Sequence, residues 1–429
     1  MWQTLFHIPL ELGGLPVFGG GILLVAWAIF SLGLLAWLAR RQGFNADTLS
    51  YAPILLVVAA VIGWLLPALC DQDGFPIHGY GIMLLLAILA ALALAVQRGK
   101  RLGLEPDLVY SLALWMILPG IVAARAFYVI EYWPIQYYPV YAERGALALL
   151  GAVVNVAQGG LVVYGGFLAG VLGLLAFARQ HKLPALALAD LIAPSLVLGL
   201  ALGRIGCLLN GCCYGGVCHL PWAITFPGES FAYLTQVERG EMYGFRLSGD
   251  PNAAAILLAV DADSAAGQAG LKPGERLEKI NGLRVENAGE AQACLLASYR
   301  DGRALRIEAA GAAAADLPAA EIRHRSLPVQ PTQIYSFIDA TLICLLLLAA
   351  GSFCRRDGEV FALGVSIYAV TRFLIEILRC DEAPISGTGM TISQNISLGL
   401  LILAAGLWCY ILSRPKGKTI SVVGVQARS

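Results

Sequence analysis

The chain has 429 residues, of which 58% are hydrophobic and only 14% are charged, and its mean hydropathy is +0.71. This composition excludes an ordinary water-soluble domain, because too much apolar surface would face water. Lysine plus arginine and aspartate plus glutamate each number 29, so no excess of positive charge points to nucleic acid as a partner. The sequence therefore predicts a membrane protein.

Nine apolar stretches follow one another along the chain, each near the ~20 residues that a helix needs to cross a membrane. They cover residues 18–39, 52–69, 81–97, 109–130, 161–178, 186–209, 333–353, 359–379 and 395–413. No lysine or arginine precedes the first stretch and Arg40 and Arg41 follow it, which is the wrong polarity for a cleaved signal peptide. We therefore expect an all-α polytopic membrane protein of about nine transmembrane helices.

Cationic loops follow every odd-numbered stretch. They contain Arg40 and Arg41, then Arg98, Lys100 and Arg101, then Arg179 and Lys182, then Arg355 and Arg356, then Arg414, Lys416 and Lys418. Loops rich in lysine and arginine stay on the cytoplasmic side of a membrane. The pattern predicts an extracytoplasmic N-terminus, a cytoplasmic C-terminus, and an extracytoplasmic location for the long loop at residues 210–331.

The long outward loop changes character near Tyr243, where short strand-like runs alternate with Gly, Pro and Asp turn residues. Its segment ILLAVDADSAAGQAGLKPGERLEKINGLRV resembles the core of bacterial PDZ domains. That resemblance implies a small β-rich extracytoplasmic module with a possible peptide ligand. We expect residues 243–311 to form it, after two additional helices in residues 1–70 and the first part of a membrane core in 71–242. Residues 312–429 then supply a tether and the last three helices.

Ionisable side chains within the apolar stretches point to function, because an unpaired charge there costs several kcal/mol. They are Arg125, Asp190, Arg204, Asp339, Arg372, Glu376 and Arg379. Several of the arginines fall near the outer ends of their helices, at the depth of lipid headgroups. Guanidinium binds two oxygens of a phosphodiester at once and is always charged. The alternative is that these arginines only anchor helix ends by reaching towards the interface.

Six motifs accompany these side chains in the order HGYGIM (78–83), ARAFYV (124–129), GGLVVYGG (159–166), GRIGCLLNGCCYG (203–215), QPTQIY (330–335) and YAVTRFLIEILR (368–379). In this order they resemble the prolipoprotein diacylglyceryl transferases. The family's glycine-arginine signature falls on Gly203, Arg204, Gly206, Asn210, Gly211 and Gly215. The resemblance covers the last seven helices, so the first two helices and the PDZ-like module are additions to the family plan.

Charge placement and the resemblance together predict the site. The expected catalytic residues are Arg204, Arg372, Tyr164 and Glu376, and the expected substrate-binding residues are Tyr80, His78, Arg125, Gly159, Gly165, Gly203, Asn210, Gly215, Gln333, Tyr335 and Arg379. The two catalytic arginines would neutralise a departing phosphate, and Glu376 would orient Arg372. For the glycine doublets, helix packing by small residues is the alternative to contact with a headgroup.

The chain departs from the family pattern at three positions. Tyr164 stands where better-known members carry a histidine, Cys207 where they carry asparagine, and Cys212 where they carry glutamate. Tyr164 is the candidate proton acceptor, provided that neighbouring arginines make its phenol more acidic. Cysteines 207, 212, 213 and 218 with His219 lack the usual zinc spacing, so a disulfide, unpaired thiols and a metal site are all considered, with the disulfide favoured. No cofactor or metal is assigned.

The resemblance implies a reaction in the bacterial inner membrane. The thiol of a prolipoprotein cysteine displaces glycerol phosphate from phosphatidylglycerol and leaves a thioether-linked diacylglycerol. A non-catalytic lipid-binding scaffold that presents its PDZ-like module to peptides is the rival hypothesis. A thiol oxidoreductase is a third hypothesis, but the sequence contains no C-x-x-C motif. A membrane protease is less well supported, because neither H-E-x-x-H nor G-x-S-x-G occurs in the sequence.

Overall fold

A computed structural model describes residues 4–43, 45, 48, 50–154, 159–228, 230–310, 314–319, 324–379 and 388–419. Within these residues eight helices are long and apolar enough to cross a membrane. They are α1 (Ile22–Gln42), α5 (Gly79–Arg101), α6 (Pro106–Glu131), α8 (Val163–Gln180), α9 (Ala185–Asn210), α13 (Thr332–Ala350), α14 (Glu359–Leu378) and α15 (Ile392–Leu412). This set fits the expected polytopic membrane protein and coincides with eight of the nine apolar stretches.

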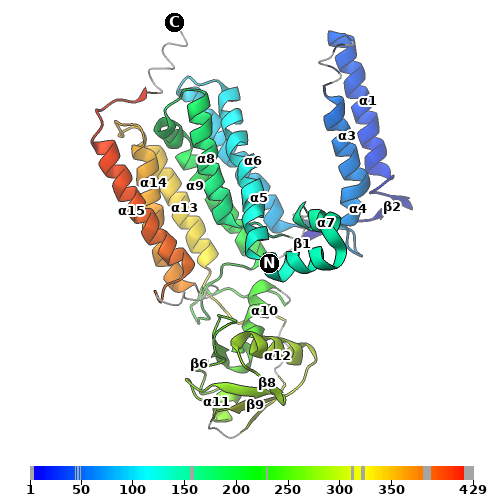
Figure 1. Cartoon of the computed structure of the whole chain (residues 1–429), viewed down its shortest axis with the longest axis vertical. Helices are drawn as coiled ribbons and strands as arrows, with labels where there is room; N and C mark the ends of the chain where they lie inside the picture. The colour runs from blue at the N-terminus through cyan, green and yellow to red at the C-terminus, as the bar shows by residue number, and fades with distance from the viewer. Residues whose placement is uncertain are drawn as a thin grey trace.

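The remaining stretch, at residues 52–69, forms a shorter apolar helix that changes hydrogen-bonding pattern part-way. It runs as α3 (Ala52–Ala60), the π-helical turn η1 (Val61–Leu65) and α4 (Leu66–Ala68). It pairs with α1, and the Trp27 indole donates to the Leu55 carbonyl at 3.0 Å. Figure 1 shows this helical pair set to one side of the other helices. The count of nine crossings therefore stays a prediction.

Short strands at the N-terminal end tie this pair to the rest of the protein. Strand β1 (Thr4–Ile8) lies antiparallel to β4 (Phe75–His78), directly before α5, and β2 (Glu11–Leu12) pairs with β3 (Leu15–Pro16). Pairing of β1 with β4 satisfies backbone groups that would otherwise lie open beside the apolar helices.

Helix α9 lies at the centre of the membrane core, where it packs against α5 and α13, while α6 pairs with α8 and α14 with α15. Its first half is almost wholly buried. There the Asp190 carboxylate accepts hydrogen bonds from the Gly358 and Phe361 amides, both at 2.8 Å. A carboxylate at a helix N-terminus satisfies backbone donors that have no partner within the helix. Asp190 therefore joins α9 to the start of α14.

Glycines bring α6 and α8 into close contact. A Cβ at Gly165 would lie 2.7 Å from the Ala123 carbonyl oxygen, and one at Gly173 would lie 2.0 Å from the carbonyl oxygen of Trp115. No side chain fits at either position. The packing alternative considered for the glycine doublets thus accounts for Gly165.

The loop between α6 and α8 contains helical segments of its own. They are the π-helical turn η2 (Trp133–Tyr137) and α7 (Tyr138–Val154), whose backbone breaks at Gly145, where φ is 79°. Positive φ is cheap for glycine and allows the chain to bend there. Figure 1 shows α7 near the N-terminus, at the same end of the core as the β-rich module.

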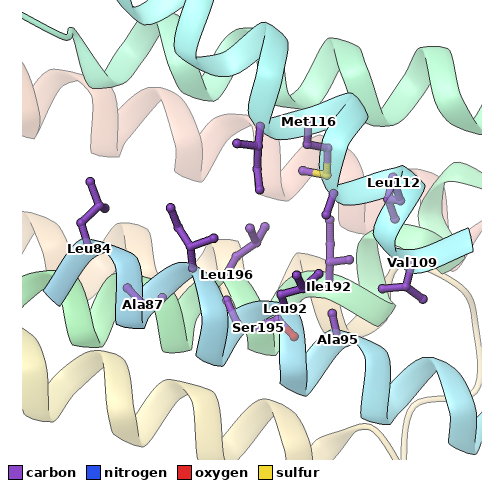
Figure 2. Close-up of a pocket in the computed structure, with 15 residues that line it drawn as sticks. Leu84, Ala87, Leu92, Ala95, Val109, Leu112, Met116, Ile192, Ser195 and Leu196 are labelled. Atoms are coloured by element: carbon purple, nitrogen blue, oxygen red, sulfur yellow. The ribbon is translucent and has the colours of Figure 1, made fainter. Parts of the chain in front are cut away.

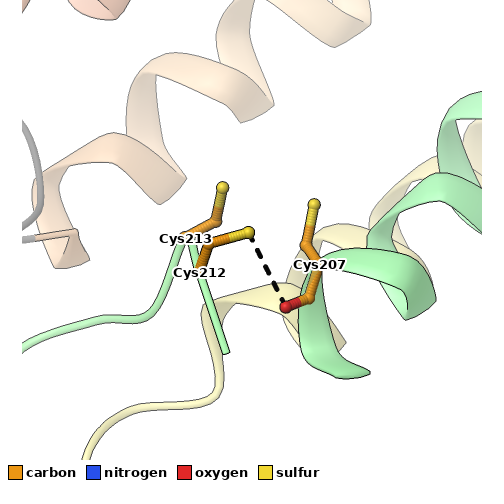
Figure 3. Close-up of side chains that lie close together, drawn as sticks. All are labelled: Cys207, Cys212 and Cys213. Carbon is orange, nitrogen blue, oxygen red and sulfur yellow. Dashed lines mark hydrogen bonds between the residues drawn. The ribbon is translucent and has the colours of Figure 1, made fainter. Parts of the chain in front are cut away.

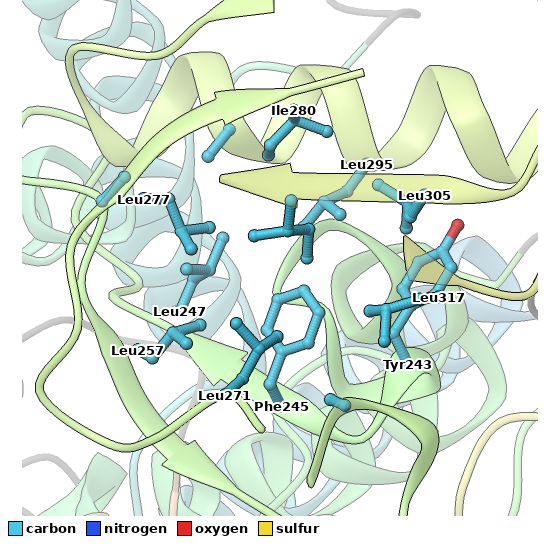
Figure 4. Close-up of a cluster of buried hydrophobic side chains, with 14 of the residues drawn as sticks. Tyr243, Phe245, Leu247, Leu257, Leu271, Leu277, Ile280, Leu295, Leu305 and Leu317 are labelled. Carbon is cyan, nitrogen blue, oxygen red and sulfur yellow. The ribbon is translucent and has the colours of Figure 1, made fainter. Parts of the chain in front are cut away.

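The β-rich module has its own apolar core (Figure 4). Its elements are β5 (Phe245–Leu247), β6 (Leu257–Val260), α11 (Ala265–Gln268), β7 (Leu277–Ile280), β8 (Leu283–Arg284), α12 (Ala288–Arg300), β9 (Leu305–Ala309) and β10 (Ala315–Leu317). The sheets run in the orders β10-β9-β7-β8 and β5-β6. Strand residues alternate between core and solvent, as in Leu305–Ala309, where Leu305 and Ile307 are buried.

This core extends beyond residues 243–311 at both ends. Tyr233 and Val237 of α10 (Phe231–Glu238) belong to it, and so does Leu317 of β10. The 3₁₀ turn η3 (Glu241–Tyr243) connects α10 to the first strand. The unit that shares one core thus runs at least from Tyr233 to Leu317.

Strand β1 and the last turn of α15 lie at opposite ends of the helical core. Figure 1 places β1 and the module at one end and the last turn of α15 at the other. Five of the eight helices of spanning length precede the module in the chain and three follow it.

Candidate functional site

Arg204 and Arg372 come from different helices and line the same small cavity. Arg204 lies in the last two turns of α9, and Arg372 lies in the second half of α14. The other lining residues are Leu200, Ser336, Asp339, Ala340, Tyr368 and Ile375. Two permanent positive charges therefore face one space of about 10 Å³, which is room for about one water molecule. The charge of its lining, rather than its size, suits a phosphate group.

Glu376 links the arginines of α14 into one network. Its side chain is wholly buried and its Oε2 pairs with Nη1 of Arg372 at 2.5 Å and with Nη1 of Arg379 at 3.4 Å. The Thr391 hydroxyl donates to the other carboxylate oxygen at 3.3 Å, and Nη2 of Arg372 donates to Ser393 Oγ at 2.9 Å. Residues one helical turn apart on a face contact each other in this way. The network fixes the direction of the Arg372 guanidinium.

The loop that follows α9 is held against α13 by side chains of the QPTQIY motif. Gly211, directly after the last residue of α9, adopts the left-handed conformation and caps the helix. Gln333 Nε2 then donates to the Cys212 carbonyl at 2.7 Å, and Thr332 Oγ1 donates to the Cys213 carbonyl at 2.6 Å. Within the described residues, the buried Oε1 of Gln333 has no hydrogen-bond partner. One acceptor next to the loop is thus available to a ligand.

Gly215 is required by the close approach of three segments. Its amide donates to the Gln330 carbonyl at 2.9 Å, and it pairs with Arg379 in an antiparallel bridge. A Cβ at this position would lie 2.8 Å from both the Gln330 Cβ and the Leu378 carbonyl oxygen. Only glycine fits there, so Gly215 lets the loop, the start of α13 and the end of α14 meet.

Three thiols converge beside this loop. The Sγ atoms of Cys207, Cys212 and Cys213 lie within 4.8 Å of one another (Figure 3). Hydrogen bonds with the other two thiols, and the positive charges of Arg379 and Arg204, lower the pKa of the Cys213 thiol. Hydrogen bonds to Cys207 and Cys213 raise the pKa of Cys212. Cys218 is not part of this group, and all four cysteines are unbridged, so the favoured disulfide is not formed here.

An apolar cavity of about 240 Å³ lies between α5, α6 and α9 (Figure 2). Side chains such as Leu84, Leu112 and Leu196 line it, and its far wall includes Gly199 of α9. Gly199 precedes Arg204 by five residues on the same helix, which is a rise of roughly 7.5 Å. A Cβ at Gly203, between them, would meet no atom within 4 Å. The apolar space between α5, α6 and α9 thus lies beside an earlier part of α9 than the cationic space between α9, α13 and α14.

The aromatic residue Tyr80 lies at the same end of this arrangement. It occupies the first turn of α5, is partly exposed, and packs against Gly206, where a Cβ would lie 3.1 Å from its ring. Asn210 is the last residue of α9. Tyr335 accepts a hydrogen bond from the Trp222 indole at 2.7 Å. These three predicted residues surround the C-terminal end of α9 and the start of α13.

Other predicted residues serve the fold in the α6–α8 region. Arg125 is buried and donates to four backbone carbonyls at 2.8–2.9 Å, including those of Gly159 and Gly160. Its guanidinium also lies over the rings of Tyr128 and Tyr137. These contacts clamp the end of α7 to the segment before α8 and leave little of the guanidinium for a lipid.

Two predicted residues lie at helix starts, outside the contacts described above for the arginine network. Tyr164 is in the first turn of α8 and its side chain is exposed. His78 precedes α5 and ends strand β4, opposite Thr4 of β1.

Comparison with known proteins decides the family. The family model described as "Prolipoprotein diacylglyceryl transferase" matches residues 67–410, which is most of the chain. The chain belongs to the prolipoprotein diacylglyceryl transferase family. A phosphatidylglycerol–prolipoprotein diacylglyceryl transferase of Rhodopirellula baltica is 34% identical over 454 aligned positions, covering 95% of this chain and 88% of that protein. One of Clostridium tetani is 32% identical, covering 81% of this chain and 98% of that protein.

Within this diacylglyceryl transferase, sequence reasoning missed several residues that shape the cavity. Tyr368 and Ser336 line it, and Ser393 holds Arg372. Tyr368 lies four residues before Arg372 on α14, so helical spacing gave a signal for it. Ser393 lies on α15, beyond a loop, and no sequence pattern connects it to Arg372.

Proposed function

We propose that this protein transfers the diacylglyceryl group of phosphatidylglycerol to the cysteine thiol of a prolipoprotein, with release of glycerol phosphate, in the bacterial cytoplasmic membrane. The observation that carries the proposal is the cavity shared by Arg204 and Arg372. Its charge matches the phosphate of the donor lipid, and the family membership supplies the reaction class.

The two arginines stabilise the group that departs. As the bond between the glycerol carbon and the phosphate oxygen breaks, negative charge grows on the phosphate. Guanidinium groups already aimed at that position stabilise this charge without reorganisation, which is the largest single contribution in many enzymes. Glu376 holds Arg372 through the 2.5 Å ion pair, so it positions the arginine and takes no direct part in the reaction.

The apolar cavity supports a lipid as the donor. Its lining is almost entirely aliphatic, and it lies along α9 on the inner side of Arg204. A lipid whose phosphate reaches the arginines would place acyl chain carbons along this part of the helix. Tyr80, Gly203, Asn210, Gly215, Gln333, Tyr335 and Arg379 remain the proposed contacts of the headgroup.

Tyr164 remains the residue proposed from sequence to accept the thiol proton, and its exposed position leaves room for a peptide. Direct lipid contact by His78, Arg125, Gly159 and Gly165 also remains a prediction. For Arg125 and Gly165 the structure supplies a packing role as well.

The proposed topology has nine crossings, with the N-terminus and the β-rich module outside the cytoplasm and the C-terminus inside. Five cationic loops support it, and so does the common end of the core that strand β1 shares with the module. The module is proposed to resemble PDZ domains and to bind an extracytoplasmic peptide by strand addition.

Rescue of a bacterium depleted of its own diacylglyceryl transferase tests the function. Expression of this chain should restore growth and the lipid labelling of a reporter lipoprotein. A variant with both Arg204 and Arg372 changed to lysine, present in membranes at the same level, should restore neither. Equal rescue by both proteins would contradict the assigned phosphate site, and rescue by neither would contradict the function.

A further inference from the structure

The three converging thiols have a geometry close to that of a metal site. When three sulfur atoms hold one zinc ion, each at about 2.3 Å, the sulfurs lie roughly 4 Å from one another. The Sγ atoms of Cys207, Cys212 and Cys213 already lie within 4.8 Å of one another, so small side-chain rotations complete the triangle. Across the part of the chain that the structure describes, no second such group of metal-ligand side chains occurs.

The backbone holds the triangle in place. Cys213 adopts a φ of 59°, in the left-handed region that non-glycine residues seldom occupy. Strained backbone of this kind persists only where surrounding contacts impose it, and it is frequent at functional sites. Here the contacts are the hydrogen bonds from Gln333 and Thr332 to the carbonyls of Cys212 and Cys213. Figure 3 shows the sulfur atoms of Cys207 and Cys213 pointing to the same side.

The charge of the surroundings suits thiolate ligands. Three thiolates around a zinc ion carry one net negative charge, and the guanidinium of Arg204 interacts electrostatically with Cys213 and Cys207. Arg204 and Cys207 lie three residues apart on α9, so they share a face of the helix. All three cysteines are partly accessible, which leaves an approach for a fourth ligand.

We propose that Cys207, Cys212 and Cys213 bind a zinc ion as thiolates and leave its fourth position to the acceptor thiol of the prolipoprotein. The inference rests on the proposed transfer reaction and names the group that activates its nucleophile. A site with three protein ligands and one open position is the usual arrangement of zinc that acts on a substrate. A thiol that coordinates such an ion is deprotonated at neutral pH.

The reaction balances without an oxidant or reductant. The acceptor thiol loses its proton to solvent as its sulfur binds zinc, so in this proposal the zinc ion takes the place of Tyr164 in activating the thiol. An electron pair of this thiolate forms a bond to the glycerol carbon that bears the phosphate, and the bond from that carbon to the phosphate oxygen breaks. Glycerol phosphate leaves with the electron pair of that bond, beside Arg204 and Arg372. The neutral thioether is a weaker ligand than the thiolate and leaves the zinc.

Metal binding by the full-length protein tests the site directly. Reduced, metal-free protein in detergent should bind one equivalent of Zn²⁺, and X-ray absorption should report three sulfur ligands at about 2.3 Å. A lipobox peptide should raise the sulfur count to four, while the same peptide with serine in place of cysteine should not. Cys218→Ser, in the same loop but outside the triangle, should bind Zn²⁺ as the wild type does, whereas Cys207→Ser and Cys213→Ser should not.

Turnover gives the second readout. Removal of zinc should lower the rate of lipid transfer about 100-fold, which is the lower end of the range for loss of a group that deprotonates a nucleophile. Addition of zinc should restore the rate. Zinc-free protein that transfers lipid at the wild-type rate would overturn the proposal. So would the absence of bound Zn²⁺, or a disulfide among the three cysteines in the protein as isolated. If zinc-loaded protein transfers no lipid, the proposed function fails, while the sulfur count still decides the existence of the site.

Discussion

Replacement of Arg372 by lysine separates a phosphate clamp from a simple charged anchor. Arg372 uses Nη1 to pair with Glu376 at 2.5 Å and Nη2 to reach Ser393 at 2.9 Å, while its guanidinium faces the cavity that Arg204 also lines. Lysine keeps the charge but has a single ammonium group without the planar fork. It can pair with Glu376 or point into the cavity, and it cannot do both with the same geometry.

The expected loss follows from this geometry. Removal of one preorganised donor from a developing oxyanion typically lowers turnover ~10²–10³-fold. Because lysine retains the charge, we expect the lower value, about 100-fold in kcat, which is roughly 2.7 kcal/mol in activation free energy. The Michaelis constant for phosphatidylglycerol should change much less, because the interaction lost forms mainly in the transition state.

The assay is steady-state transfer from labelled phosphatidylglycerol to a lipobox peptide by purified protein. Arg356→Lys is the matched control, because Arg356 forms an ion pair with Glu359 at 3.3 Å near the opposite end of α14, away from the cavity. It should retain wild-type turnover. Wild-type turnover in Arg372→Lys would refute the clamp and make Arg372 an anchor of the helix end.

Three further predictions concern the surroundings of the cavity. Glu376→Gln leaves two buried arginines without their shared counter-charge, so the free energy of unfolding, measured by thermal unfolding, should fall by about 3 kcal/mol. An unchanged midpoint of thermal unfolding would contradict the ion-pair network. Gly215→Ala places a Cβ 2.8 Å from the Leu378 carbonyl oxygen. The free energy of unfolding should therefore fall by about 2 kcal/mol, and the rate of lipid transfer should fall with it. Wild-type stability would show that the loop has space for a methyl group. Alkaline phosphatase fused after Pro318 should be active and one fused after Arg179 inactive, and the reverse pattern would overturn the topology.

The membrane helices could be predicted from sequence because an apolar run of sufficient length is a local property. Eight runs became helices of spanning length. The run at 52–69 has the apolar composition of a membrane helix, but it changes to a π-helical turn before Pro67. Composition alone therefore predicted a longer regular α-helix than the structure contains. The boundary of the module was harder to predict, because α10 joins its core through tertiary contacts of Tyr233 and Val237 that leave no strand-like pattern.

The site residues that belong to sequence motifs could be predicted. Residues whose role depends on tertiary packing were harder to predict. Arg204 and Arg372 were found from their motifs, and the structure brings them to one cavity. Arg125 has the same side chain at a similar depth, but backbone carbonyls from a distant loop take up its donors. No sequence pattern reveals that difference. The approach of Cys207 to Cys213 likewise depends on the left-handed turn after α9, which spacing rules for zinc motifs do not describe.

Mass spectrometry of a lipobox peptide tests the central claim most directly. The purified protein should convert the peptide, in the presence of phosphatidylglycerol, to a product heavier by one diacylglyceryl group on its cysteine, with one glycerol phosphate released for each product. The same protein with Arg204→Lys and Arg372→Lys should form almost none. Absence of the thioether product from wild-type protein that binds phosphatidylglycerol would contradict the account.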